Sequence, residues 1–160
     1  MSGTQQAALS GPTLADLLTI DSGASMFYSY AREVEVSRIF TDAEARTTVL
    51  VPTNKAIVAM PKKPHQSISD DATTSEEGSD SRSNVEKWVS AHIIPESPIV
   101  LAPKTYPTLL PGKNVSFTDV SDEREEEWRR VLLEGKVRIT ATRVASNGVL
   151  YFIDGTVSVD

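Results

Sequence analysis

The feature that most constrains this chain is a change of hydrophobic period at Pro95. Before it, apolar side chains recur at helical spacing, most clearly in one complete stripe at i, i+3, i+4, i+7 and i+8: Val85, Trp88, Val89, His92 and Ile93. After it, short β-branched runs alternate with turn signals. Helices first and strands second predict an α+β domain with segregated elements. A chain of 160 residues is long enough to give one such domain a sizeable core.

Two further helices are expected near the N-terminus. Thr13 is a candidate N-cap for a helix in which Leu14, Leu17 and Leu18 recur at i, i+3 and i+4. A second helix is expected over residues 25–40, where an apolar face alternates with charged residues that point outward. The N-terminal part of the domain is therefore predicted to be helical.

A buried strand interrupts this helical half. Residues 47–51 are β-branched and continuously apolar, apart from two threonines, which is typical of a strand covered on both faces. Pro52 is expected to end it. Thr53 or Asn54 is expected to cap a short helix that runs to Met60.

The composition changes sharply at Pro61. Segment 61–84 contains a single aliphatic residue, Ile68, among many Ser, Asp and Glu. Such a segment cannot bury enough apolar surface to offset its chain entropy. We predict one domain over 13–160 with a disordered acidic insert at about 61–84, and a flexible leader over 1–12. Ser83 or Asn84 is then expected to cap the helix that follows.

A run of short strands is expected beyond Pro95. The predicted strands are 99–101, 105–110, 114–120, 128–133, 136–142, 149–153 and 156–159. Turns are expected at Pro111-Gly112-Lys113, at Glu134-Gly135 and at Asn147-Gly148. Between two of these strands, the acidic stretch 121–127 is either a solvated loop or a surface for a basic partner.

Charge and composition disfavour several classes of partner. A net charge of −6 argues against nucleic acid and against docking on anionic membrane by charge alone. No apolar run approaches the roughly 18 residues of a membrane span. The absence of cysteine excludes disulfides and thiolate chemistry. The first residues do not form a signal peptide, which leaves a cytosolic protein or the mature part of a secreted one. A monomer is expected.

The candidates for catalysis are His92, His65 and Asp154. His92 could act as a general base, but its place on an apolar stripe favours a hydrogen-bonded core histidine. His65 lies in the predicted insert and is interpreted as solvated, and a carboxylate that ends a strand, as Asp154 does, usually bonds backbone amides. The two histidines lack metal-ligand spacing, and no nucleophile elbow or phosphate loop occurs. We therefore expect no enzyme, no cofactor and no metal site.

Three short motifs in this chain resemble those of the fasciclin domain family. Residues 48–57 (TVLVPTNKAI) resemble the first signature box, 92–95 (HIIP) the central element, and 147–154 (NGVLYFID) the second box. Their order and spacing agree over nearly the whole chain, allowing for the 61–84 insert. The signature residues are Thr48, Pro52, Thr53, Asn54, His92, Pro95, Asn147, Gly148, Ile153 and Asp154. The chain is also similar to fungal single-domain members of the secretory and vacuolar pathway.

The resemblance implies a fold and a type of function. The implied fold is a wedge-shaped β-sandwich of short, mostly antiparallel strands, with the N-terminal and central helices packed on it. The implied function is cell adhesion or protein interaction on the secretory route (vacuole, cell surface or extracellular), with a protein or a cell-wall glycan as partner. Integrin-type recognition is not implied: Ala91 stands where animal integrin binders have Tyr before His92, and Gly155 follows Asp154 where they have Ile.

Two residues outside the motifs are candidates for function. Asn114 begins Asn114-Val115-Ser116, the only glycosylation sequon in the chain, and a hairpin tip is expected to expose it. It is a candidate glycosylation site if the protein enters the secretory route. Trp128 is either an exposed interface anchor or a core residue beside Val131. An alternative function is an intracellular or lumenal adaptor that acts through the disordered acidic loop 61–84.

Overall fold

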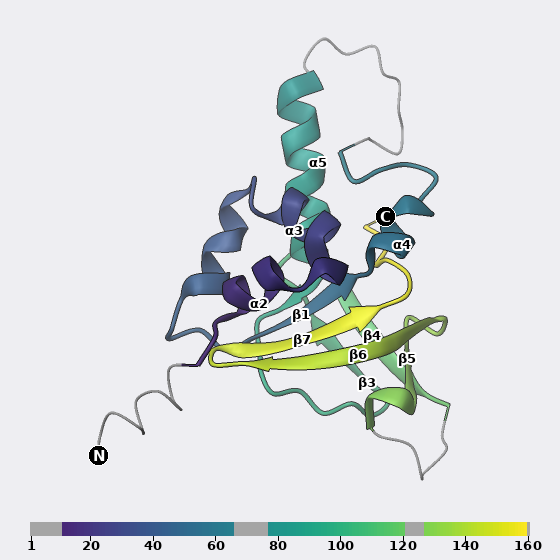
Figure 1. Cartoon of the computed structure of the whole chain (residues 1–160). Coiled ribbons are helices and arrows are strands. Elements are labelled where there is room, and N and C mark those ends of the chain that lie inside the picture. The colour runs from purple at the N-terminus through teal and green to yellow at the C-terminus, as the bar shows by residue number, and fades with distance from the viewer. Residues whose placement is uncertain (1–10, 66–76, 121–126, 160) are drawn as a thin grey trace, which may run out of the picture.

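The computed structural model describes residues 11–65, 77–120 and 127–159. Helices lie over one side of a seven-stranded sheet with strand order β2-β1-β7-β6-β5-β4-β3 (Figure 1). In chain order the elements are α2 (Leu14–Ile20), η1 (Ser22–Ala24), α3 (Ser25–Ala31), η2 (Glu35–Thr41), β1 (Thr47–Pro52), α4 (Asn54–Val58), α5 (Glu77–Ala91), β2 (Ile93–Ile94), β3 (Lys104–Pro107), β4 (Asn114–Asp119), η3 (Glu127–Arg129), β5 (Val131–Leu133), β6 (Val137–Ala145) and β7 (Gly148–Ile153).

The sheet is mixed and curls on itself. β1 runs parallel to β7, and every other neighbouring pair is antiparallel. The Leu109 N–H donates to the Ile93 carbonyl at 2.9 Å, which joins the segment after β3 to β2, the strand at the opposite end of the order. The predicted α+β class with a sandwich-like sheet, mostly antiparallel strands and packed helices is confirmed.

Two apolar cores lie on the two faces of the central strands. Successive side chains of a strand point to opposite faces. Val49 and Val51 of β1 therefore pack with the helices, whereas Leu50 packs with β3, β4 and β5 inside the curled sheet. This explains why β1 is buried along its whole length and reads as a continuous apolar run.

The predicted caps of the two short helices are confirmed. The Thr13 hydroxyl accepts a hydrogen bond from the Asp16 N–H at 3.2 Å, and the Asp16 carboxylate accepts one from the Thr13 N–H at 3.0 Å. These two bonds form a capping box at the start of α2. Thr53 caps α4 through the Ala56 N–H at 3.2 Å.

The predicted helix over 25–40 is wrong in its middle. The structure has α3 up to Ala31 and a separate 3₁₀ helix, η2, from Glu35. Val34 between them is extended (φ −120°, ψ 156°) and buried. A β-branched residue loses side-chain freedom in a helix, and here it packs into the core in the extended form instead.

The predicted disorder is wrong at both ends of the insert. α5 begins at Glu77, so Ser83 and Asn84 lie inside the helix and do not cap it. Helix propagation costs little once the packed C-terminal turns are formed. At the other end, the Lys63 ammonium donates to the carbonyls of Val58 (3.0 Å) and Met60 (2.8 Å) after α4. Residues 66–76 of the insert lie outside the described residues.

The predicted leader and the acidic stretch are described only in part. Residues 1–10 of the leader and 121–126 of the acidic stretch lie outside the described residues. The described end of the leader is bonded to the domain, because the Pro12 carbonyl accepts from the Ser146 N–H at 2.8 Å.

Two predicted strands are absent from the described part of the chain, at 99–101 and 156–159, although Ile99, Leu101 and Val157 are buried. The Tyr106 hydroxyl bonds both backbone groups of Val100 at 2.9 Å and takes the place of a strand partner. The Val157 N–H is bonded to a histidine ring nitrogen. The patterns predicted burial correctly but not the bonding of the backbone.

The helical stripe wrongly includes Ile93, because α5 ends at Ala91 and Ile93 begins β2. The other β elements follow the prediction with shifted bounds. Residues 128–133 form η3 and the short β5, and the first hairpin strand, predicted as 105–110, is β3 and ends at Pro107. Gly112 (φ 83°), Glu134 (φ 57°) and Gly135 (φ 76°) take the left-handed conformations of tight turns at two predicted positions.

Candidate binding surface

His92 joins the end of α5 to the C-terminal segment. Its side chain is fully buried, with Nδ1 2.7 Å from the Trp88 carbonyl oxygen and Nε2 2.9 Å from the Val157 nitrogen. Because the Val157 N–H can only donate, Nε2 accepts and Nδ1 carries the proton that is donated to Trp88. Burial lowers the pKa of His92 to about 4; the bond to Trp88 opposes this shift and the charge of Lys113 adds to it. The ring is therefore neutral at pH 7.

Asn147 fixes the helices to the β6–β7 turn. Its buried Oδ1 accepts from the Leu14 N–H at 2.9 Å, and its Nδ2 donates to the carbonyls of Phe40 (3.0 Å) and Asp42 (3.1 Å). The side chain thus satisfies backbone groups from the start of α2 and the end of η2.

Gly148 follows in a position that excludes any side chain. A Cβ there would lie 1.9 Å from the Thr47 carbonyl oxygen. Gly148 is also the residue opposite Thr47 in the parallel β1–β7 ladder. The close approach of these two strands therefore requires glycine.

Asn54 and Thr48 bond backbone groups of other elements. The Asn54 Oδ1 accepts from the Met26 N–H at 2.9 Å and so satisfies a donor in the first turn of α3. The Thr48 hydroxyl donates to the Glu96 carbonyl at 2.7 Å and holds the turn that follows Pro95. Both side chains act within the fold.

The end of the second box ties β6 to β7. The Asp154 Oδ1 accepts from the Arg138 N–H at 2.9 Å, and the Asp154 N–H donates to the Arg138 carbonyl at 3.0 Å. Pro52 and Ile153 are paired across β1 and β7 and are buried. The signature residues are therefore spread over helix caps and strand ends, and they do not converge on one site.

The described residues contain neither a candidate metal centre nor a helix that could span a membrane. Among residues 11–65, 77–120 and 127–159, no three His, Asp or Glu side chains come together in a way that could hold a metal ion. Each helix within these ranges is too short or too polar to cross a bilayer.

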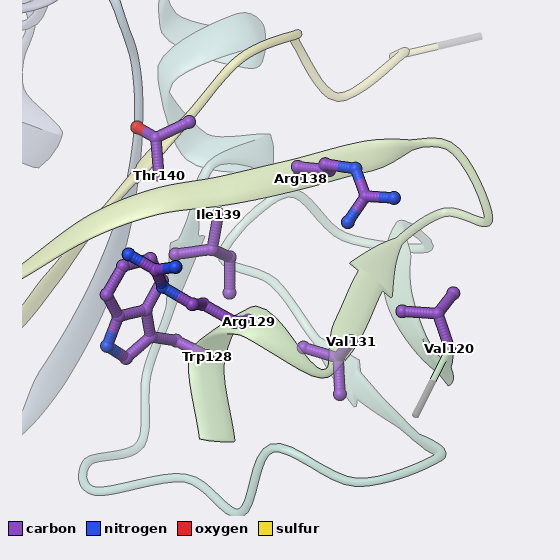
Figure 2. A pocket seen from close by; sticks show the side chains of 7 residues that line it. All are labelled: Val120, Trp128, Arg129, Val131, Arg138, Ile139 and Thr140. Atoms are coloured by element: carbon purple, nitrogen blue, oxygen red, sulfur yellow. The ribbon is translucent and has the colours of Figure 1, made fainter. Parts of the chain in front are cut away.

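The surface feature of most interest is a groove beside Trp128. Figure 2 shows Trp128 and Arg129 at one end of it and Val120 at the other. Its volume is about 430 Å³, and its lining comes from the end of β4, from η3 and from β5 and β6: Val120, Trp128, Arg129, Val131, Arg138, Ile139 and Thr140. The groove lies where η3 covers part of β6.

The groove combines an apolar wall with guanidinium groups. Trp128 is half-buried and packs on the core inside the curled sheet. The Arg129 guanidinium carbon lies 5.0 Å from the centroid of its ring, a cation–π contact. The side chain of Arg138 is exposed, and among the described residues no carboxylate lines the groove. Trp128 therefore packs on a core, as one of the two interpretations predicts, and it also lines a surface groove.

The sequence motifs did not predict the arginines of this groove. Arg129 and Arg138 belong to no motif, and their separation along the chain gives no sign that they share a groove. The only sequence signal was Trp128, an aromatic residue beside an acidic stretch.

Asn114 is placed as the turn predicts. It is the first residue of β4, opposite Pro107, and its side chain is exposed. The position is accessible to a modifying enzyme.

The family model of the fasciclin domain matches residues 22–158. This chain belongs to the fasciclin domain family. The family as a whole consists of adhesion and protein-interaction modules. The resemblance inferred from the three motifs is thus confirmed at the level of the family.

Several fungal proteins are similar to this chain. A FAS1 domain-containing protein of Emericella nidulans is 29% identical over 156 residues, covering 92% of this chain and 62% of the relative. One of Aspergillus fumigatus is 33% identical over 96 residues, covering 54% and 41%. One of Saccharomyces cerevisiae is 27% identical over 187 residues, covering 96% and 68%. The chain therefore spans less than two thirds of the first two relatives.

A solved structure shares the fold. It is a FAS1 domain pair from the insect cell adhesion molecule Fasciclin I, which superposes with a TM-score of 0.61 at 15% identity. The match covers 92% of this chain and 51% of that one. At this identity the likeness concerns the fold alone.

Proposed function

We propose that this chain is a non-enzymatic protein-interaction or cell-adhesion module of the secretory or vacuolar pathway. Its partner is a protein or a cell-wall glycan, and it acts as a monomer. The observation that carries the proposal is the groove of about 430 Å³ that pairs the half-buried Trp128 with the exposed Arg138. Tryptophan and arginine are the residues most enriched among the anchors of binding interfaces.

The surroundings of the histidines and of Asp154 support a role without catalysis. A general base must reach its substrate with a free lone pair. Both ring nitrogens of His92 are engaged with backbone groups in a buried site, and Asp154 accepts from the Arg138 N–H. His65 is exposed, and its ring is stacked on Tyr30 at 6.2 Å between centroids.

Retention on the cell envelope tests this function. The purified, labelled domain is incubated with fungal cell walls and with detergent-solubilised envelope proteins, and the retained fraction is measured for the wild type and for Trp128→Ala. We expect the variant to bind about tenfold more weakly, as is common for an interface tryptophan. Val58→Ala is the matched control, because Val58 is 62% exposed on α4 outside the groove. Equal retention of all three proteins would contradict the proposed function.

A further inference from the structure

The strand β6 has an open edge beyond its second residue. β6 runs from Val137 to Ala145, but β5 pairs with it only at Val137 and Arg138. On its other side, β7 pairs with β6 as far as Ala145. Figure 1 shows the β6–β7 ribbon continuing to the left of β5. Within the described ranges, no other strand pairs with residues 139–145 on the outer side.

The register of β7 determines which backbone groups of β6 face outward. The Thr47 N–H donates to the Asn147 carbonyl (3.2 Å) and the Thr53 N–H to the Ile153 carbonyl (3.0 Å). The odd-numbered residues from 147 to 153 therefore turn their backbone groups toward β1. The even-numbered residues between them face β6, since the direction alternates along a strand. Their partners on β6 are Ala141, Arg143 and Ala145.

The backbone groups of Thr142 and Val144 consequently point away from β7. The Thr142 carbonyl accepts from the Arg143 guanidinium at 2.9 Å, as an outward group can. Val144 also exposes its side chain, at 75%. The outward N–H groups of Thr142 and Val144 and the Val144 carbonyl have no strand partner in the described ranges, and such groups on an edge strand are a template for another strand.

This edge runs between two hollows that both contain arginine. At one end lies the Trp128 groove, which Arg138, Ile139 and Thr140 of β6 border. At the other end Arg143 borders a hollow of about 360 Å³ together with four residues of the helical layer: Leu17, Ile20, Asp21 and Ser22. Side chains of an added strand would point alternately to the two sides of the sheet, where these hollows lie.

The charges along the edge favour an acidic partner. Arg138 and Arg143 line the two hollows, and among the described lining residues the single carboxylate is that of Asp21, 3.5 Å from the Arg143 Nε. The side chain of Arg138 is exposed on β6, and an acidic side chain of a partner can pair with it. A second copy of the chain would bring the same arginines together, and the bulge between Ile139 and Ala141 further disfavours edge-to-edge pairing of copies.

We propose that an extended acidic segment of a partner protein adds to the sheet as a strand along β6. Its backbone bonds the outward groups of Thr142 and Val144, one apolar side chain enters the groove against Trp128, and its carboxylates face Arg138 and Arg143. This inference rests on the proposed function as an interaction module, and it specifies the chemistry of the partner.

The test uses synthetic heptapeptides of alternating acidic and apolar residues, with the apolar positions varied across an array. Binding to the purified chain is measured by fluorescence anisotropy at low and moderate salt, since exposed charges are screened by salt. The best-binding peptide is then compared with two controls: one with Lys in place of Asp and Glu, and one N-methylated at alternate backbone amides. We expect the Lys peptide to lose binding. The N-methylated control is made in two forms, one with methyl groups on the odd-numbered amides and one with them on the even-numbered amides. We expect only the form whose methyl groups face β6 to lose binding.

Matched variants of the chain separate charge from strand pairing. Arg138→Glu is expected to weaken binding at least tenfold, whereas Lys136→Glu, an exposed neighbour outside the groove, changes it less than threefold. Val144→Pro removes an outward N–H and is expected to weaken binding tenfold, while Val144→Ala retains it. Circular dichroism is used to check that each variant is folded, and the N-methylated peptides test strand pairing without any substitution in the chain.

Several outcomes would overturn the inference. The first is that no peptide of the array binds. The second is that the two N-methylated forms, or the Lys peptide and the acidic peptide, bind equally well. The third is that the wild-type chain is a dimer that Val144→Pro dissociates, because β6 would then pair with a second copy of the chain. If any of these occurs while Trp128→Ala still weakens envelope retention about tenfold, strand addition is wrong and the proposed function stands. If envelope retention is lost for all proteins while the acidic peptides bind as described, the proposed function fails instead.

Discussion

The signature residues His92 and Asn147 lie in a different environment from the groove residues Trp128 and Arg138. His92 and Asn147 are fully buried, and their polar atoms are bonded to backbone groups of distant elements. Arg138 and Trp128 lie at the surface, beside a strand whose partner ends early. These residues of the family motifs therefore hold helices and strands of the fold together. The groove that we propose as the binding surface carries no motif.

The comparison also shows why this fold does not determine the side chains of the groove. The bonds of Asn147 and Asn54 are made to backbone groups, which every sequence with this fold provides. The groove is made by side chains of η3, β5 and β6, which can change without disturbing those bonds. Each of the following predictions tests one side of this division.

The largest effect is expected for Asn147→Ala. The substitution leaves the Leu14 N–H and the carbonyls of Phe40 and Asp42 without their partner in a buried site. At about 1–3 kcal/mol for each unsatisfied group, partly relieved by water, the loss should be about 3–5 kcal/mol. Urea unfolding measures it, and Asn114→Ala, at an exposed asparagine, is the control. A loss of less than about 1 kcal/mol in the free energy of unfolding would contradict the structural role assigned to Asn147 in the second box.

The next effect concerns His92 and pH. Its folded pKa of about 4 lies below the ordinary value of 6.5, so the unfolded chain binds a proton first as the pH falls. The stability that this group contributes is complete above pH 6.5 and is lost as the pH falls toward 4. The full loss corresponds to about 3 kcal/mol as an upper figure. His92→Gln should be less stable at pH 7 and should lack this part of the pH dependence. A wild-type curve that is flat between pH 6.5 and 4 would contradict the burial of a neutral ring.

How far sequence predicts structure differs between the two regions for a physical reason. Thr13, Thr53 and the Asn147-Gly148 turn were predictable because caps and turns depend on neighbouring residues. The break at Val34 was not, because a valine in a helical pattern is also stable when extended and buried. Ile99 and Leu101 show the same limit, since their pattern gives burial but not the Tyr106 hydroxyl that replaces a strand. The groove depends on the unequal lengths of β5 and β6, which no local pattern specifies.

The insert should have a smaller effect if it is cut where the structure indicates. Replacing 66–76 by a Gly-Ser linker of similar length is expected to change the free energy of unfolding by less than about 1 kcal/mol. Replacing all of 61–84 should cost more, because it removes the Lys63 contacts at α4 and the first turns of α5. Thermal unfolding of both chains decides this. Equal stability of both would show that those contacts contribute nothing.

The smallest effect on stability is expected for Asn114→Gln, within about 0.5 kcal/mol, since the side chain is exposed. Its value lies in testing the compartment. If the protein passes through the secretory route, mass spectrometry of material from its native organism should find a glycan on Asn114. Unmodified Asn114 throughout would argue against secretory residence and would leave the fold untouched.

The most direct test of the central claim measures stability and binding on the same two variants. His92→Gln should lower the urea midpoint at pH 7, while its folded fraction binds the acidic peptide and the cell envelope as the wild type does. Arg138→Glu should leave the midpoint within the range of a surface substitution and weaken peptide binding at least tenfold. If instead His92→Gln keeps the midpoint and abolishes binding, while Arg138→Glu binds normally, then the buried histidine belongs to the functional site and the division drawn between core motif and surface groove is wrong.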